Sequence, residues 1–235
     1  WHFANSVFLS GYTQEERIKF IDKVFSKFKE RFGYYPVSVG AWWIDSFSLK
    51  YMHDKYGVIG NLSCADQYST DNYQIWGTYW STPYYPSAFH SGLPAKNSKD
   101  KIGIVTIQWA SRHPRNGYYS SLYSLQDYLT TPDKHDSSYF KSLLEVYAHK
   151  NKNSFGQITV GLEADLTPEI YQKEFLNQIQ IVSSDNATKL TMADFSRWYK
   201  DRFPEVSPEH TVDFEGMFWY QSPFYRLGID KTNKK

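Results

Sequence analysis

The sequence contains a single cysteine, Cys64, among its 235 residues. An internal disulfide needs a second cysteine and a cysteine-rich zinc site needs several, so both are excluded. Long apolar runs are also missing, because no stretch approaches the roughly 20 apolar residues that cross a bilayer. We therefore expect no membrane segment in this chain.

Charge of one sign is equally scarce. Lys and Arg number 26 against 25 Asp and Glu, which leaves a net charge of +1. Dedicated nucleic-acid binders carry a basic surface, so nucleic acid is not an expected partner. The chain also lacks a phosphate-binding glycine motif and a repeat of about 20–50 residues. Its hydrophobic content of 41% excludes intrinsic disorder.

Aromatic residues, by contrast, are abundant. Phe, Trp and Tyr make up 19% of the chain, and 20 of these residues are tyrosines. Tyr and Trp combine an apolar face with a polar tip. Two interpretations stay open: a large aromatic core, or a wet concave surface that suits the C–H faces and hydroxyls of sugars.

Hydrophobic periodicity predicts an α/β protein with parallel strands, because helical and strand patterns alternate along most of the chain. Thr13 and Glu16 form a capping box that opens a helix through Phe32. A second helix begins at Ser46 and ends at Gly57, and Pro168 occupies the first position of another. Further helices are expected at 120–130, 137–150 and 191–203, and strands at 37–43, 58–64, 101–109, 158–163 and near 188–190.

The last 25 residues alternate as strands and no longer follow the β/α pattern. We expect residues 1–208 to form a barrel-like or open parallel-sheet domain, and residues 209–235 to form a β extension that could begin a further β domain. The chain starts at Trp1 without a leader and ends in a solvated tail. It is therefore expected to be part of a longer polypeptide.

In parallel α/β folds, reactive groups gather after the carboxyl ends of the strands. Four acidic residues follow predicted strands and are candidate catalytic groups: Asp45, Asp66, Asp71 and Glu163. Two carboxylates can hydrolyse a glycosidic bond, and carboxylates with histidine can hold a metal that activates water. The alternative is structural, because an Asp after a strand often caps the next helix, as Asp45 before Ser46 would.

Candidate substrate-binding residues lie in the same positions and in the long aromatic loop at 65–87. The segment 83–86 holds two tyrosines between prolines, and these could form a stacking wall or a packed lid. The candidates are Trp42, Trp43, Gln67, Trp80, Tyr84, Tyr85 and Gln108. His2 and His90 are weak candidates for metal ligands, because the sequence has no His-x-x-x-His or His-Glu-x-x-His spacing.

Residues 30–58, ERFGYYPVSVGAWWIDSFSLKYMHDKYGV, resemble the middle of the polysaccharide deacetylase (NodB-like) superfamily in layout. The related barrels of glycoside hydrolase families 57 and 38 share this arrangement of a helix, a Gly-x-x-Pro turn, a strand, a helix and a further strand. The resemblance implies a distorted (β/α)7-type barrel, incomplete at its N-terminus, that acts on carbohydrate. In it, Asp66 or Asp71 would take the acid-orienting position, and His2 would match one histidine of a zinc site.

The chain lacks the Asp-Asp motif, the second zinc histidine and the arginine of that superfamily. Three hypotheses therefore stay open. The first is a deacetylase-like hydrolase acting on an oligo- or polysaccharide at the barrel mouth, with a divalent metal such as zinc. The others are a carboxylate-pair glycosidase and a non-catalytic glycan-binding domain of a larger surface protein. An interaction module is a further alternative, and an extracytoplasmic location is favoured.

Overall fold

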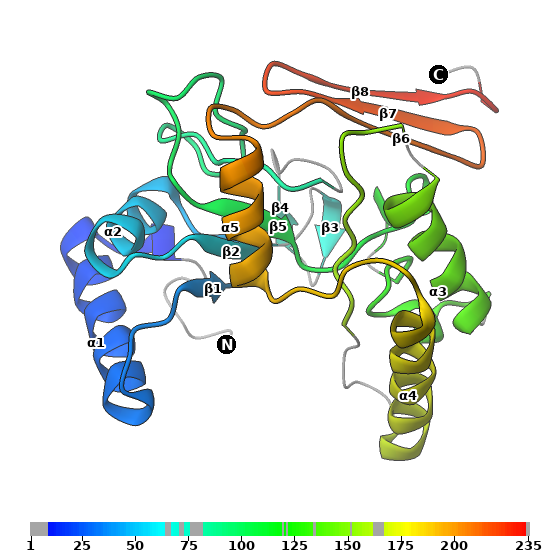
Figure 1. Cartoon of the computed structure of the whole chain (residues 1–235), viewed down its shortest axis with the longest axis horizontal. Coiled ribbons are helices and arrows are strands. Elements are labelled where there is room, and N and C mark those ends of the chain that lie inside the picture. Colours follow the sequence, from blue (N-terminus) through cyan, green and yellow to red (C-terminus); the bar gives the residue numbers. More distant parts are fainter. Residues whose placement is uncertain are drawn as a thin grey trace. The chain divides into compact units, whose positions relative to one another are not determined.

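The computed structural model describes residues 9–63, 67–70, 73–75, 82–118, 120, 122–133, 135–150, 152–161 and 167–233. The chain divides into two compact units (Figure 1). The parallel-sheet unit comprises residues 1–64, 77–109 and 190–208, and the antiparallel-sheet unit comprises residues 65–76, 110–189 and 209–235. The predicted division at residue 208 stays a prediction, because compact packing units need not be domains that fold alone.

Helix α1 (Gln14–Phe32) follows a short 3-10 turn, η1 (Leu9–Gly11). The predicted capping box is confirmed: Thr13 Oγ1 accepts from the Glu16 amide, and the Glu16 carboxylate accepts from the Thr13 amide at 2.9 Å. The helix ends at Gly33, whose φ of +82° is the left-handed conformation that favours glycine. Local side-chain chemistry therefore sets both ends of α1.

Three short parallel strands form the sheet of the first unit, in the order β1 (Ser38–Gly40), β2 (Gly60–Ser63), β5 (Val105–Gln108). Helix α2 (Ser46–Tyr56) connects β1 to β2. Asp22 of α1 accepts hydrogen bonds from the hydroxyls of Tyr51 and Tyr56, and it forms an ion pair with Lys55. These interactions join α2 to α1. These contacts use tyrosines both as apolar packing surface and as hydrogen-bond donors.

The helices pack on the sheet through a core that includes Phe25 of α1, Leu49 of α2 and Ile104. Helix α5 (Met192–Arg202) contacts β2 and β5, and Figure 1 shows it alongside these strands. A Cβ atom at Gly60 would lie 2.8 Å from Ser196 Oγ of α5. Gly60 therefore allows α5 to pack closely against β2.

The α/β class with parallel strands is confirmed, whereas no closed barrel forms among the residues that the structure describes. Two predicted strands have no pairing partner among the described residues. These are the described part of the strand at 158–163 and the strand at 188–190. Their β-branched residues favour an extended backbone, but a strand also needs a partner for its backbone groups. These two strand predictions are wrong for the described residues.

The predicted helix at 120–130 is wrong for a different reason. Described residues in this range form turns and a 3-10 segment, η3 (Tyr128–Thr130). Ser124 Oγ accepts from the amides of Gln126 and Asp127, and Ser120 Oγ accepts from the amide of Leu122. Such local side-chain bonds compete with helical ones and favour turns.

In the antiparallel-sheet unit, α3 (Ser137–Leu144) continues into a π-helical turn, η4 (Glu145–His149), and packs against α4 (Pro168–Ser184). The predicted helix beginning at Pro168 is confirmed, and α3 is capped by Asp136, whose side chain accepts from the Ser138 amide. Strands β3 (Gln67–Thr70) and β4 (Tyr73–Ile75) form an antiparallel pair, and η2 (Asn116–Tyr118) lies against β3.

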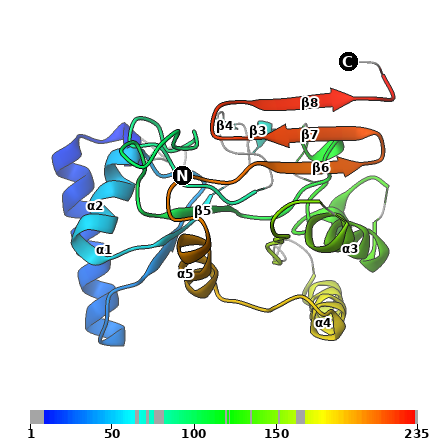
Figure 2. The same cartoon turned by 45° about the horizontal axis from the view of Figure 1, so that its top comes forward.

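The predicted C-terminal strands are confirmed as an antiparallel sheet of β6 (His210–Phe214), β7 (Met217–Gln221) and β8 (Arg226–Asp230). Figure 2 shows them side by side, with β7 in the middle. Val212 and Trp219 are buried on one face, and the Trp219 indole donates a hydrogen bond of 2.7 Å to the carbonyl of Pro114. Within the described chain, no helix is long and apolar enough to span a membrane.

Candidate functional site at the carboxyl edge of the parallel sheet

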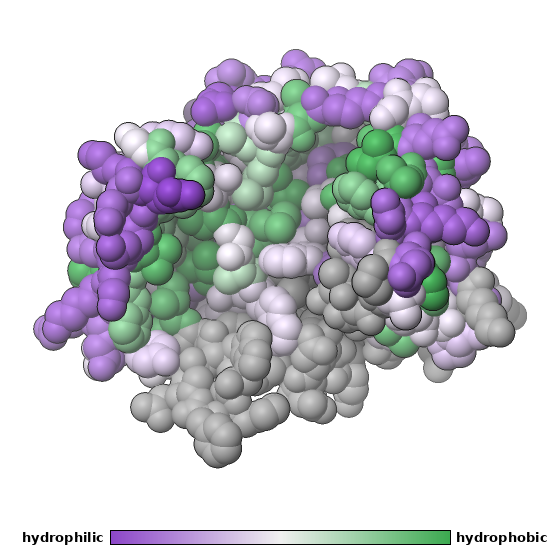
Figure 3. Space-filling view, turned by 90° about the horizontal axis from the view of Figure 1, so that it is seen from below, coloured by the Kyte–Doolittle hydropathy of each residue, from purple (hydrophilic) through white to green (hydrophobic). Residues whose placement is uncertain are grey.

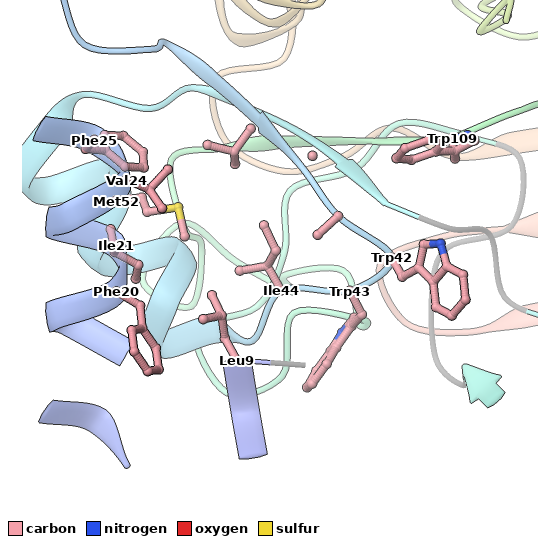
Figure 4. Close-up of a pocket in the computed structure, with 13 residues that line it drawn as sticks. Leu9, Phe20, Ile21, Val24, Phe25, Trp42, Trp43, Ile44, Met52 and Trp109 are labelled. Carbon is pink, nitrogen blue, oxygen red and sulfur yellow. The ribbon is translucent and has the colours of Figure 1, made fainter. Parts of the chain in front are cut away.

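Three tryptophans lie where strands of the parallel sheet end. Trp42 and Trp43 follow β1, and Trp109 follows β5 directly. Because parallel strands end at the same edge of a sheet, residues far apart in sequence come together here. In Figure 4 the three indoles occupy one end of a groove, opposite the side chains of α1.

Ser63, the last residue of β2, links two of these tryptophans. Its hydroxyl donates to the carbonyl of Trp42 at 2.9 Å, and its carbonyl accepts from the Trp109 amide at 2.6 Å. The central strand of the sheet therefore holds the backbones of both tryptophans in place. The sequence analysis did not select Ser63, and its only signal was its position at the end of a strand.

The groove beside the tryptophans has a volume of about 450 Å³. Its walls come from α1, from β1 with the turn after it, and from single residues of η1, α2 and the end of β5. The lining is almost entirely apolar: Leu9, Phe20, Ile21, Val24, Phe25, Val39, Gly40, Ala41, Trp42, Trp43, Ile44, Met52 and Trp109.

Parts of this lining are exposed to solvent. Phe20 and Val24 of α1 keep 43% and 64% of their surface exposed, and Trp109 keeps 37%. The space-filling view shows hydrophobic residues at the surface next to hydrophilic ones (Figure 3). Neither Phe20 nor Val24 was among the predicted site residues. The signal for Phe20 was that large side chains surround α1 more widely than a single packing face requires.

Polar side chains line the face of the sheet that Val39 shares. Val39 pairs with Asn61, Asn61 pairs with Thr106, and Ser63 pairs with Gln108, so these residues point to the same side. Asn61 Nδ2 donates to Thr106 Oγ1 at 3.3 Å. Gln108 is 5% exposed, and its amide has no hydrogen-bond partner among the described residues. Buried amides of this kind are uncommon and mark a place where water or a ligand group can bind.

Asp45, a predicted catalytic residue, is the N-cap of α2. Its Oδ1 accepts from the Ser48 amide at 3.0 Å, and its Oδ2 accepts from the Ser48 hydroxyl at 2.7 Å. Arg17 of α1 donates to Oδ1 at 3.1 Å. These bonds match the helix-capping alternative of the sequence analysis, and they leave the carboxylate little capacity for another role.

The predicted stacking tyrosines are core residues. Tyr84 and Tyr85 are only 2% and 1% exposed. The Tyr84 hydroxyl donates to the carbonyl of Ser91, and the Tyr85 hydroxyl donates to that of Phe203, both at 2.8 Å. Burial raises the pKa of Tyr85, so its hydroxyl stays protonated. Tyr84 pairs with Thr106 of β5 and the Tyr85 ring contacts Tyr199 of α5, so their burial supports the packed alternative.

His90 stacks near Trp43 with ring centroids 5.6 Å apart, and its Nδ1 accepts from the Gly92 amide at 3.1 Å. No three His, Cys, Asp or Glu side chains converge on a metal-sized site within the described ranges. The predicted metal site stays a prediction, because His2 lies outside the described residues. His2, Asp66, Asp71, Trp80 and Glu163 lie outside the described residues, as does the side chain of Gln67.

The antiparallel-sheet unit contains its own buried titratable cluster, which sequence analysis missed. Tyr139 of α3 lies between His113 and His135, with its ring within 12° of parallel to both. His113 Nε2 lies 3.2 Å from the Glu215 carboxylate, and burial lowers the pKa of His113. A neutral His113 fits this apolar stack.

Comparison with known proteins adds family and fold information. A model of the family described as a domain of unknown function with solved structure, DUF3863, matches residues 3–222. A crystal structure from Parabacteroides distasonis, of a protein described as a candidate glycoside hydrolase/deacetylase, has a TM-score of 0.66 and 13% sequence identity. The match covers 92% of this chain and 58% of that chain, so this chain spans little more than half of that protein. No curated protein matches.

Proposed function

Because this chain belongs to the DUF3863 family and shares the fold of a candidate glycoside hydrolase/deacetylase, we propose that it is a carbohydrate-active domain. It holds a glycan at the carboxyl edge of the parallel sheet. The observation that carries this proposal is the grouping of Trp42, Trp43 and Trp109 beside an apolar groove, with Ser63 bonded to two of them.

The chemistry of the edge suits a sugar ring. Indole faces pack against the C–H face of a pyranose, because both surfaces are flat and apolar. The polar atoms of a binding site then fix the orientation of the ligand. Gln108 is the candidate for this role, because its buried amide offers a donor and an acceptor that no described residue uses. A glycan stacked on Trp109 would place hydroxyls at the adjacent end of β5.

Hydrolysis in this proposal falls to Asp66 and Asp71, which follow β2 in the sequence, and to Glu163. One carboxyl group donates a proton to the leaving oxygen, and another activates water or attacks the sugar. Asp45 favours a second candidate function, a glycan-binding domain without turnover. Its carboxylate caps α2 and pairs with Arg17, so this acid at the sheet edge has a structural role and not a catalytic one.

The first experiment measures glycan binding by calorimetry after a screen of soluble oligosaccharides. Trp109→Ala should lower affinity at least tenfold, whereas Trp198→Ala should leave it unchanged. Trp198 lies on α5 and is a matched control, because it is 39% exposed against 37% for Trp109. Equal affinity losses in both variants, or no binding by the folded wild-type chain, would refute the proposed site.

A second experiment separates hydrolysis from binding. The chain is incubated with each bound glycan, and released acetate and reducing ends are measured. If the domain is a hydrolase, Asp66→Asn abolishes turnover and retains binding. Binding without any turnover by the wild-type chain would establish the glycan-binding domain instead.

A further inference from the structure

Strand β8 is an open edge of the antiparallel sheet. It pairs with β7, and no described strand pairs with its other side (Figure 2). Proteins usually protect such edges with proline, a bulge or an inward-pointing lysine. Residues 226–230 contain neither proline nor lysine, and their pairing with β7 runs through five residues without a register shift. The edge therefore lacks proline, lysine and a bulge, and its two charged residues are Arg226 and Asp230.

The direction of the backbone groups identifies which residues face outward. The Ser222 amide donates to the Tyr225 carbonyl at 3.0 Å, and the Lys231 amide donates to the Gly216 carbonyl at 2.8 Å. Hydrogen-bonding direction alternates along an antiparallel strand. The backbone N–H and C=O groups that point toward β7 are therefore those of every second residue: Tyr225, Leu227, Ile229 and Lys231. The backbone groups of Arg226, Gly228 and Asp230 then point away from β7.

The sequence of this edge is complementary to itself. When two copies of residues 226–230, RLGID, are aligned antiparallel about Gly228, Arg226 of each copy lies opposite Asp230 of the other. Leu227 and Ile229, which are 46% and 38% exposed, then lie opposite each other. Opposite charges and matched apolar side chains at facing positions both stabilise strand pairs.

Both charged residues are already held near the edge. Arg226 lies over the Trp219 ring, with its guanidinium carbon 5.6 Å from the ring centroid. The Asp230 carboxylate accepts from Arg115 at 3.1 Å and from Asn233 at 2.7 Å. A partner strand therefore meets side chains whose positions are largely set, which lowers the entropy lost on binding.

We propose that β8 is a dimerisation edge, where β8 of a second copy of this chain adds antiparallel about Gly228. The three outward-facing residues of each copy form hydrogen-bonded pairs, which gives about six backbone hydrogen bonds in the pair. The two three-stranded sheets become one six-stranded sheet. Five paired residues bury less surface than a standard stable interface, so the dimer depends on protein concentration.

Charge exchange tests both the partner and the register. Sedimentation velocity of the wild-type chain should show a concentration-dependent dimer. Arg226→Asp places two acidic residues opposite each other, and Asp230→Arg does the same with two basic residues, so each variant should be monomeric alone. An equimolar mixture of the two restores opposite charges at both contacts and should form a heterodimer.

Three outcomes would overturn the proposal. These are a wild-type chain that is monomeric up to the highest soluble concentration, dimers that persist in both single variants, and a mixture of folded variants that stays monomeric. Thermal unfolding verifies that each variant is folded, since Asp230 also contacts Arg115. If a longer form of the protein is monomeric while this chain dimerises, the rest of the polypeptide covers the edge and the two-copy assignment fails for that form.

A disulfide test does not depend on the charged residues. In a Cys64→Ser background, Leu227→Cys with Ile229→Cys places thiols opposite each other across the two copies, at the short spacing of a non-hydrogen-bonded pair. Mild oxidation should produce a covalent dimer. Leu227→Cys alone is the matched control, because its two thiols would be diagonal neighbours. Equal cross-linking by both variants would contradict the proposed register.

Discussion

The two sheets of this chain are assembled differently. The parallel sheet is covered by helices from separate parts of the sequence, whereas the antiparallel sheet is built from three consecutive strands. The parallel sheet has strands of three or four residues, and β5 is buried at all four of its positions. It depends on helices α1, α2 and α5, which come from both ends of the parallel-sheet unit in the sequence. The antiparallel sheet has five-residue strands joined by short turns, and it buries one face while Leu227 and Ile229 stay exposed.

This difference shows how each sheet relates to function. Parallel strands cannot pair through a tight turn, so their edges bring together residues that are distant in sequence. The three tryptophans of the candidate site meet in this way. The antiparallel sheet forms from neighbouring segments and leaves a regular edge, which suits a partner strand better than a small ligand.

The largest effect is expected in the core of the parallel-sheet unit. Leu49 lies on α2 and is fully buried in the core that α1, α2 and the sheet share. Leu49→Ala should lower the free energy of unfolding by about 2–5 kcal/mol, because it removes buried contacts and leaves a cavity. Urea denaturation measures this loss. A loss below about 1 kcal/mol would contradict the view that this sheet depends on its helix packing.

Acid should destabilise the antiparallel-sheet unit through His210. Burial lowers the pKa of His210 to about 4, against roughly 6.5 in the unfolded chain. Between these pH values the unfolded chain binds a proton that the folded chain does not, so stability falls as pH decreases from 6.5 to 4. The loss could reach about 3 kcal/mol.

The pH dependence of urea unfolding tests this expectation. His210→Gln keeps a hydrogen-bond acceptor near Asn153 and removes the titrating group. Its stability should decline less steeply between pH 6.5 and 4, with the remaining slope due in part to His113. Parallel pH profiles for the variant and the wild type would show that His210 is not the acid-sensitive group.

Each sheet has a glycine at which an added Cβ would lie within 3.0 Å of another side chain, which allows a matched comparison. An added Cβ would lie 2.8 Å from Ser196 Oγ at Gly60, and 2.7 Å from the Trp219 ring at Gly228. Gly60→Ala and Gly228→Ala should each cost about 1–3 kcal/mol through overpacking. Gly228→Ala should cost more, because the hydrogen bond to Pro114 fixes the indole, whereas a serine hydroxyl can rotate. Chemical denaturation would reveal the reverse order if the indole can move.

The smallest effect is expected at the exposed turn between β7 and β8. Phe224 is 70% exposed, and its amide donates to Ser222 Oγ. Phe224→Ala keeps this backbone bond, so the free energy of unfolding should change by less than about 0.5 kcal/mol. A larger loss by thermal denaturation would show that this turn packs against other residues and that the exposed face is not open.

Sequence reasoning succeeded where structure is local. The capping box of Thr13 and Glu16 and the helix start at Pro168 follow from contacts within one helical turn. It failed where a strand needs a distant partner and where side chains compete locally with the backbone bonds of a helix. Residues 158–161 have strand composition but no described partner, and serines at 120 and 124 bond to nearby amides in place of a helix.

The candidate site was predicted in part for the same reason. The position of Trp42 and Trp43 after one strand and of Gln108 at the end of another could be read from the order of elements, because strand ends share an edge. The burial of Tyr84 and Tyr85 could not, since prolines on either side indicate a rigid segment but not the direction it faces. Tyr85 contacts Phe203 and Tyr199, more than 110 residues away, and Tyr84 pairs with Thr106 of β5, so distant segments decide it.

The sequence by itself determined the α/β class, both ends of α1, the start of α4 and the C-terminal strands, because capping bonds and residue alternation act over a few positions. It also determined the self-complementary charge pattern of β8. Tertiary structure decided which strands pair and which aromatic residues face solvent. These outcomes depend on contacts between distant segments, whose energies exceed local propensities and do not appear in any single stretch of residues.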